Sequence, residues 1–288
     1  MNKQQIIKKL TVKVKELDQA KNNKYRRQIN RVIKQAVQAE KSLQLLSFTC
    51  STINSQYLFS STPWKYVSLN PAGNNLESDL PKLQNIIEEL RAIYPRIELV
   101  ILIGNTDPYY IYLQQFQGLK NKKVVWQRFS KRWERYYQKL SGWVKRRIPL
   151  QGIKIISWFK WERQLEKQEG ASFEKQFSQT KNRLNNYFIR ADLDWELRAL
   201  SKQFGAGKYF IKLRKPSQRL LKDWIIRKFA EYAVQGLWIY EQFPNGILIQ
   251  NEKPSKLRSK MYQPLIREKY RSSLPIIYPY GVDNTGYQ

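Results

Sequence analysis

The chain of 288 residues contains no histidine and a single cysteine, Cys50. Without histidine there is no imidazole base, no histidine metal ligand and no Ser–His or Cys–His dyad. A single cysteine excludes an internal disulfide and any zinc site built on a cysteine cluster. Any chemistry must therefore use Ser, Tyr, Lys, carboxylates or the substrate itself, and we expect neither a cofactor nor a metal.

The sequence also lacks any stretch near the ~18 consecutive apolar residues that a membrane-spanning helix needs. Its basic, amphipathic N-terminus has neither the apolar run nor the small-residue cleavage site of a signal peptide. We therefore predict a cytoplasmic protein without a membrane span, and we expect it to be a monomer.

Acidic residues are scarce: 23 Asp and Glu stand against 52 Lys and Arg, which gives a formal charge of +29. Aromatic residues make up 14% of the chain, so it can form a core, unlike a disordered basic tail. Positive charge on a folded surface repels itself, and a polyanion relieves this repulsion. Nucleic acid is the usual polyanion, because Lys and Arg release counterions from its phosphates. An anionic membrane surface is the alternative.

Hydrophobic patterning predicts helices alternating with strands. The strands are expected at 43–49, 97–104, 153–159, 247–250 and 274–282. The helices are expected within 3–41 and at 81–94, 122–147, 172–203 and 217–241, with Pro81 in a first turn. This alternation favours a mostly parallel sheet flanked by helices. We predict the α/β class, with a single Rossmann-like domain over 41–288 and a basic helical N-terminal extension over 1–40.

The helix predicted over 122–147 carries ten Lys and Arg and one Glu. A solvated charged face is the ordinary interpretation of such a helix, but charge of nearly one sign favours phosphate binding. No zinc finger, RNP-type signature or GxGxxG loop accompanies it, so we expect shape and backbone recognition of structured RNA, tRNA first. The candidate tRNA-binding residues are Arg128, Lys131, Arg132, Arg135, Lys139, Lys145, Arg146 and Arg147.

A serine follows the first predicted strand, in LLSFTCSTINSQYLF. Ser51 lies where α/β folds bind ligands, beyond the carboxyl end of a strand. Ser and Thr at such a place can also simply cap a helix or fill a turn. The neighbouring Cys50 is a second candidate nucleophile, although a lone Cys in an apolar run is usually just buried. Tyrosines also occur at the ends of two later elements, in LWIYEQFPNG (237–246) and IIYPYGV (276–282). Tyrosines at the ends of helices and strands are, however, also common as residues at the edge of a hydrophobic core.

Over about residues 40–288 the order of these segments resembles the tRNA-dependent cyclodipeptide synthases. In that family a Gly-x-Ser-x-x-Asn-Ser-like segment follows the first strand. Here TCSTINS matches at Ser51 and Asn54, with Thr49 in place of the glycine. The family's late Tyr, followed by His or Pro, corresponds to Tyr278-Pro279, so the chain resembles the Tyr-Pro branch.

The family's Tyr-x-x-x-Glu pair, which precedes a proline, has no complete match in this chain. When the motif is aligned on Pro244, Trp238 and Gln242 stand at the Tyr and Glu positions. A shift by one residue places Leu237 and Glu241 at these positions. The resemblance implies that Asn54, Trp238, Glu241 and Gln242 bind the substrate.

The resemblance also implies acyl transfer between two aminoacyl-tRNAs, with formation of a cyclic dipeptide. Ser51 would accept the first aminoacyl group and Tyr278 would take part in proton transfer. The position of Glu241 or Gln242 would hold the substrate ammonium. An aminoacyl ester is already activated, so neither ATP nor a metal is needed. A non-catalytic tRNA- or RNA-binding protein and a peripheral membrane protein remain alternatives, whereas a nuclease is disfavoured because no metal-ligand cluster is present.

Overall fold

The computed structural model describes residues 1–20, 23–50, 76–104, 152–157, 232–249 and 262–279, and short helical pieces between 134 and 164. The N-terminal part consists of α1 (Lys3–Leu17), α2 (Arg26–Gln38), β1 (Leu43–Cys50), α4 (Leu76–Arg91) and β2 (Ile97–Gly104). The remainder consists of β3 (Ile153–Ser157), β4 (Gly246–Ile249), α12 (Pro264–Tyr270) and β5 (Ile276–Ile277). A further helix covers residues 232–242.

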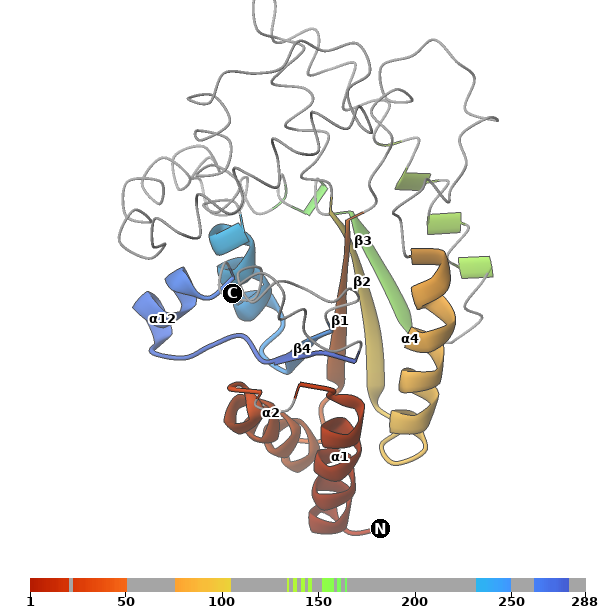
Figure 1. Cartoon of the computed structure of the whole chain (residues 1–288), viewed down its shortest axis with the longest axis vertical. Helices are drawn as coiled ribbons and strands as arrows, with labels where there is room; N and C mark the ends of the chain where they lie inside the picture. The colour runs from red at the N-terminus through yellow and green to blue at the C-terminus, as the bar shows by residue number, and fades with distance from the viewer. Residues whose placement is uncertain are drawn as a thin grey trace, which may run out of the picture.

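The five strands form one parallel sheet in the order β3-β2-β1-β4-β5 (Figure 1). The order runs outward in both directions from β1, as in Rossmann folds. In the register of the sheet, Ser47 of β1 lies between Ile101 of β2 and Ile249 of β4, which in turn pairs with Ile277 of β5. The predicted α/β fold, with its parallel sheet and flanking helices, is confirmed.

The central strands are rich in apolar residues, as is usual for a parallel sheet whose two faces are covered by helices. Leu45 and Leu46 of β1, on opposite faces, are both 0% exposed, and every residue of β4 is buried. β1 and β2 pair over their whole length, from Leu43 with Ile97 to Cys50 with Gly104. These two strands are the centre of the fold.

Three elements differ from the sequence-based expectation, and one of them is β5, which is limited to Ile276–Ile277 within the described part of the strand predicted over 274–282. α4 begins at Leu76, so that Pro81 is the sixth residue of the helix and not in its first turn. The helix therefore lacks one N–H donor in its second turn, and burial of Ile87 and Leu90 further along compensates for that loss. α12 was not predicted, although Pro264 at its start is a recognisable sign of a first helical turn.

The first two helices pack into the same core as the sheet. α1 starts at a capping box, in which Asn2 and Gln5 exchange hydrogen bonds of 2.9 and 3.1 Å. Leu10 of α1 and Ile33 of α2 are 0% exposed and belong to the hydrophobic cluster that contains the strands. Apolar burial of this kind contributes about 1.5–3 kcal/mol per large side chain. The division into 1–40 and 41–288 remains a prediction.

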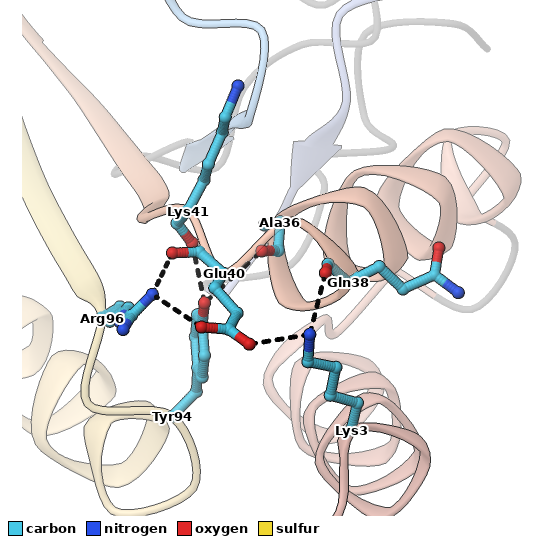
Figure 2. Close-up of polar contacts among 7 residues, drawn as sticks. All are labelled: Lys3, Ala36, Gln38, Glu40, Lys41, Tyr94 and Arg96. Carbon is cyan, nitrogen blue, oxygen red and sulfur yellow. Dashed lines mark hydrogen bonds and ion pairs between the residues drawn. The ribbon is translucent and has the colours of Figure 1, made fainter.

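Glu40, just after α2, is the centre of a polar clamp at the amino end of β1 (Figure 2). Its carboxylate lies 2.7 Å from Lys3 Nζ of α1, and Arg96 before β2 contacts both its carboxylate and its backbone carbonyl. The hydrogen bond from Lys3 is the main cause that keeps the pKa of Glu40 below its ordinary value. Because these charges are exposed, they contribute to specificity of packing more than to stability.

Tyr94 completes the clamp from below (Figure 2). Its hydroxyl donates to the carbonyl of Lys41 at 2.8 Å and to that of Ala36 at 3.4 Å. The side chain is 6% exposed, and burial raises the pKa of its phenol. The last turn of α2 is thereby fixed to the turn before β2.

Glu98 of β2 accepts hydrogen bonds from two neighbouring strands. Ser42 Oγ, Gln44 Nε2 and Lys154 Nζ lie 2.9, 3.4 and 3.1 Å from its carboxylate oxygens. Burial alone would raise the pKa of Glu98, but the hydrogen bonds, led by that of Lys154, outweigh it and lower the pKa. A carboxylate with a lowered pKa stabilises the fold above its ordinary pKa, and the stabilisation is lost as the pH falls through the folded pKa.

We expect Glu98→Gln to lower the melting temperature at pH 7 by about 2 °C, which corresponds to about 0.5–1 kcal/mol for a partly exposed carboxylate. The difference in melting temperature between the variant and the wild type should shrink as the pH falls below 4.5, the ordinary pKa of a glutamate. Thermal unfolding between pH 3 and 8 measures it. Glu88→Gln, at an exposed carboxylate that contacts only Gln84 among the described residues, is the matched control. A difference that is constant with pH would contradict the prediction.

Candidate functional site

The order of the sheet reverses between β1 and β4, and in open α/β sheets ligands bind outside the carboxyl ends of the strands at such a reversal. Cys50 is the last residue of β1 and Ser51 follows it directly. Ser51 and Asn54 both lie outside the described residues. The end of β1 is nevertheless the place in this sheet where a ligand is expected.

Tyr278 directly follows β5 and is 6% exposed. Its backbone is held by the connection between α1 and α2. The backbone N–H of Tyr278 donates to Asp18 Oδ1 at 3.2 Å, and its carbonyl accepts from the N–H of Gln19 at 3.1 Å. The backbone of Tyr278 is therefore held on both sides, and its side chain is buried.

A second buried tyrosine, Tyr25, lies beside Tyr278. Tyr25 is 1% exposed, and its pKa is raised mainly by burial and further by the neighbouring phenol of Tyr278. Gln263, just before α12, hydrogen-bonds the Tyr25 phenol. The Gln263 side chain also holds Leu274 at both backbone groups, with distances of 2.9 and 3.2 Å. No local pattern in the sequence predicts this group of polar residues.

Asp18 and Asn23 join the helical N-terminus to the last strand. Asn23 Nδ2 donates to Asp18 Oδ2 at 2.6 Å and to the carbonyl of Ile276 at 2.7 Å. Asp18 is 8% exposed and Asn23 is 6% exposed. Their partners in β5 and just after it lie 253 and 260 residues away along the chain, so no local pattern in the sequence could reveal this network.

We expect Asp18→Ala to destabilise the protein by about 2 kcal/mol, because the buried N–H of Tyr278 and one donor of Asn23 would lose their acceptor. For a chain of this size the melting temperature should fall by about 4–8 °C. Glu16→Ala is the control, since Glu16 lies in the last turn of α1 but its side chain is 60% exposed. An equal, small effect of both substitutions in thermal unfolding would show that the network contributes little.

Trp238 and Gln242 are four residues apart in the helix over 232–242, and their environments differ. Trp238 is 2% exposed and is among the largest fully buried side chains of the described residues. Gln242 is exposed. The structure thus places Trp238 in the core and leaves Gln242 accessible to solvent.

Glu241 contacts α12. Its Oε1 accepts hydrogen bonds from Lys269 Nζ and from the hydroxyl of Tyr270, both at 2.7 Å. The hydrogen bond to Glu241 is the main cause that raises the pKa of Lys269. The ring of Tyr270 packs against Tyr240 with 5.2 Å between centroids. The carboxylate of Glu241 is therefore engaged by a cation of this chain.

Only two of the candidate tRNA-binding residues, Lys145 and Arg146, are described, and both are exposed helical residues. The helical piece before them is fixed to β3 and the segment after it. The Tyr137 hydroxyl donates to the carbonyl of Ile155 at 2.9 Å, and Lys160 pairs with Glu134 at 2.6 Å. The others lie outside the described residues: Arg128, Lys131, Arg132, Arg135, Lys139 and Arg147.

The described part of the chain shows neither a metal-binding cluster nor a membrane-spanning helix. It contains no group of three or more Cys, Asp or Glu side chains placed to hold a metal ion. Among its helices, none combines the length and the apolar character that crossing a membrane requires.

No protein-family model matches the sequence. No curated protein matches it either. Among solved structures, the chain is similar to one described as the structure of a CDPS (cyclodipeptide synthase) from Fluoribacter dumoffii. The two share 13% sequence identity with a TM-score of 0.43, and the alignment covers 82% of this chain and 88% of that chain.

Proposed function

We propose that this protein is a tRNA-dependent cyclodipeptide synthase that joins two aminoacyl groups through an aminoacyl-Ser51 intermediate. The observation that carries the proposal is the order of the sheet, which reverses at β1 directly before Ser51. The serine of the Ser-x-x-Asn segment thus follows the strand at which α/β sheets bind their ligands. The formal charge of +29 supports a polyanionic substrate such as aminoacyl-tRNA.

In this mechanism the Ser51 hydroxyl attacks the carbonyl carbon of an aminoacyl-tRNA ester. The bond between that carbon and the ribose oxygen breaks, and the serine proton passes to the leaving ribose hydroxyl. The free amine of a second aminoacyl-tRNA then attacks the aminoacyl-serine, which forms a peptide bond and returns a proton to Ser51. Finally the remaining amine attacks the second tRNA ester, releasing the tRNA and closing the diketopiperazine.

The other residues have supporting roles in this proposal. Tyr278 takes part in the proton transfers, within the group of buried polar side chains that includes Tyr25. Asn54, Trp238 and Gln242 contribute to substrate binding. Glu241 holds the substrate ammonium, which would replace Lys269 as the cation at a carboxylate already suited to one. The basic residues of 122–147 bind the tRNA, and the protein acts as a cytoplasmic monomer of the Tyr-Pro branch.

A non-catalytic tRNA- or RNA-binding function is the second candidate. The contacts of Glu241 favour it, because Lys269 and Tyr270 already satisfy the carboxylate that a synthase would offer to its substrate. Such a protein would need the basic surface but not Ser51.

Mass spectrometry of culture supernatant tests the proposal. Cells that overproduce the chain should release a diketopiperazine that cells with the empty vector do not release, and its mass identifies the two amino acids. Absence of the product, together with tRNA binding by the purified protein, would favour the non-catalytic function.

A further inference from the structure

Four exposed cations on α2 and beside α12 form what we call the α2–α12 surface: Arg27, Arg31, Lys34 and Arg271. The three on α2 are spaced by four and three residues, so they lie on one side of the helix. Their stripe is about 10 Å long at a rise of about 1.5 Å per residue. α2 itself contains no acidic residue.

Contacts between α2 and the residues that flank α12 link the two parts of this surface. Figure 1 shows the positions of α2 and α12 in the fold. Arg31 of α2 donates to the hydroxyl of Ser272, the residue after Arg271, at 2.8 Å. At the N-terminal end of α2, the side chain of Gln263, the residue before α12, interacts with the phenol of Tyr25 and partly offsets the rise in its pKa that burial causes. Positive side chains from residues 27–34 and from residue 271 are therefore neighbours in space.

Ion pairs balance several lysines of the described residues. The balanced pairs are Lys3–Glu40, Lys13–Glu89, Lys154–Glu98, Lys160–Glu134 and Lys269–Glu241. By contrast, Arg27, Lys34 and Arg271 form no ion pair with any residue that the structure describes. Like charges one turn apart on a helix destabilise it, so this surface is stabilised when an anion covers it.

We propose that the α2–α12 surface binds the phosphate backbone of tRNA, as a contact additional to the basic helix over 122–147. The inference rests on the proposed function for the identity of the RNA and deepens it by assigning an RNA contact to the N-terminal residues. The backbone positions of Arg27, Arg31 and Lys34 follow one another at about 4.5–6 Å along the helix axis. A row of closely spaced cations of this kind can neutralise neighbouring phosphates of a nucleic-acid strand.

An anionic membrane surface fits α2 less well than RNA does. A helix that binds in a membrane interface inserts an apolar face among the lipids. The apolar face of α2 is buried in the protein core, with Ile33 and Ala36 both 0% exposed. The exposed large apolar side chains among the described residues are Met1, Val12 and Tyr270, none of them on α2.

The test is equilibrium binding of uncharged tRNA by fluorescence anisotropy at several salt concentrations, with full-length protein carrying Ser51→Ala so that no turnover intervenes. The first variant combines Arg27→Gln, Arg31→Gln and Lys34→Gln. A second variant retains Arg31, and with it the contact to Ser272. The control combines Lys8→Gln, Lys9→Gln and Lys15→Gln at exposed positions of α1, which removes the same charge.

Each lost phosphate contact should weaken binding about fivefold at ~0.15 M salt and lower the slope of log Kd against log salt by about one. We expect about 100-fold weaker binding for the triple variant, about 25-fold for the double variant and less than about threefold for the α1 control. Equal losses in the α1 and α2 variants, or none in either, would overturn the proposal.

A membrane function would give another pattern. The α2 variants would bind tRNA as the parent does but would lose binding to vesicles containing phosphatidylserine, which would overturn the RNA assignment. None of these results depends on diketopiperazine formation, so failure of this inference and failure of the proposed function are distinguishable.

Discussion

Ser51→Ala is expected to abolish diketopiperazine formation, with a loss of at least ~1000-fold, and to leave tRNA binding unchanged. The loss follows from the proposed chemistry, because alanine cannot form the ester that carries the first aminoacyl group. Binding should persist because it depends on cations elsewhere on the surface. Product quantification by mass spectrometry and anisotropy with tRNA measure the two effects on the same preparation.

Cys50→Ala is the matched control for Ser51→Ala. It removes the neighbouring candidate nucleophile, at the last position of β1, and should retain product formation. Incubation of the wild type with one labelled aminoacyl-tRNA should in addition give a peptide whose mass is increased by one aminoacyl group at Ser51. If only the Cys50 variant lost the product and the label were found on the Cys50 thiol, Cys50 and not Ser51 would be the nucleophile.

The sheet could be predicted from sequence because its signals are local. β1 and β2 are runs of apolar residues of strand length, and such runs identify buried strands wherever their partners lie. Ile97–Gly104 was predicted with the bounds that the structure gives. The parallel arrangement could be predicted because strands that alternate with helices along a chain usually form a parallel sheet. These features depend on neighbouring residues only.

The polar surroundings of Tyr278 could not be predicted, because they depend on contacts between distant parts of the chain. Asp18 and Asn23 follow α1 and look like ordinary polar residues at a helix end. Their burial results from the packing of α1 and α2 against β5. The resemblance to a family motif likewise pointed to Glu241 as a candidate carboxylate, but it could not show that Lys269, 28 residues further on, pairs with it.

Gly236 lies where the helix over 232–242 packs directly against the backbone of Tyr262. A Cβ added at Gly236 would lie 2.1 Å from the carbonyl oxygen of Tyr262 and 2.8 Å from its carbonyl carbon. Close packing continues one turn earlier, where the rings of Tyr232 and Tyr262 meet edge to face with 5.1 Å between centroids. A backbone carbonyl cannot rotate away as a side chain can, so a methyl group at 236 must displace the helix or the Tyr262 segment.

We therefore expect Gly236→Ala to destabilise the protein by about 3 kcal/mol or more and to lower its melting temperature by about 6–12 °C. Helix propensity alone predicts the opposite, a gain of about 1 kcal/mol for Ala over Gly, so the steric conflict has to exceed that gain. Gly142→Ala is the matched control, because among the described residues the atom near the added Cβ of this helical glycine belongs to the flexible Arg146 side chain, at 3.6 Å. Thermal unfolding should show Gly142→Ala equal to or more stable than the wild type. If Gly236→Ala were stabilised in the same way, the close approach of this helix to Tyr262 would be wrong, and with it the packing that buries Trp238 and directs Glu241 towards α12.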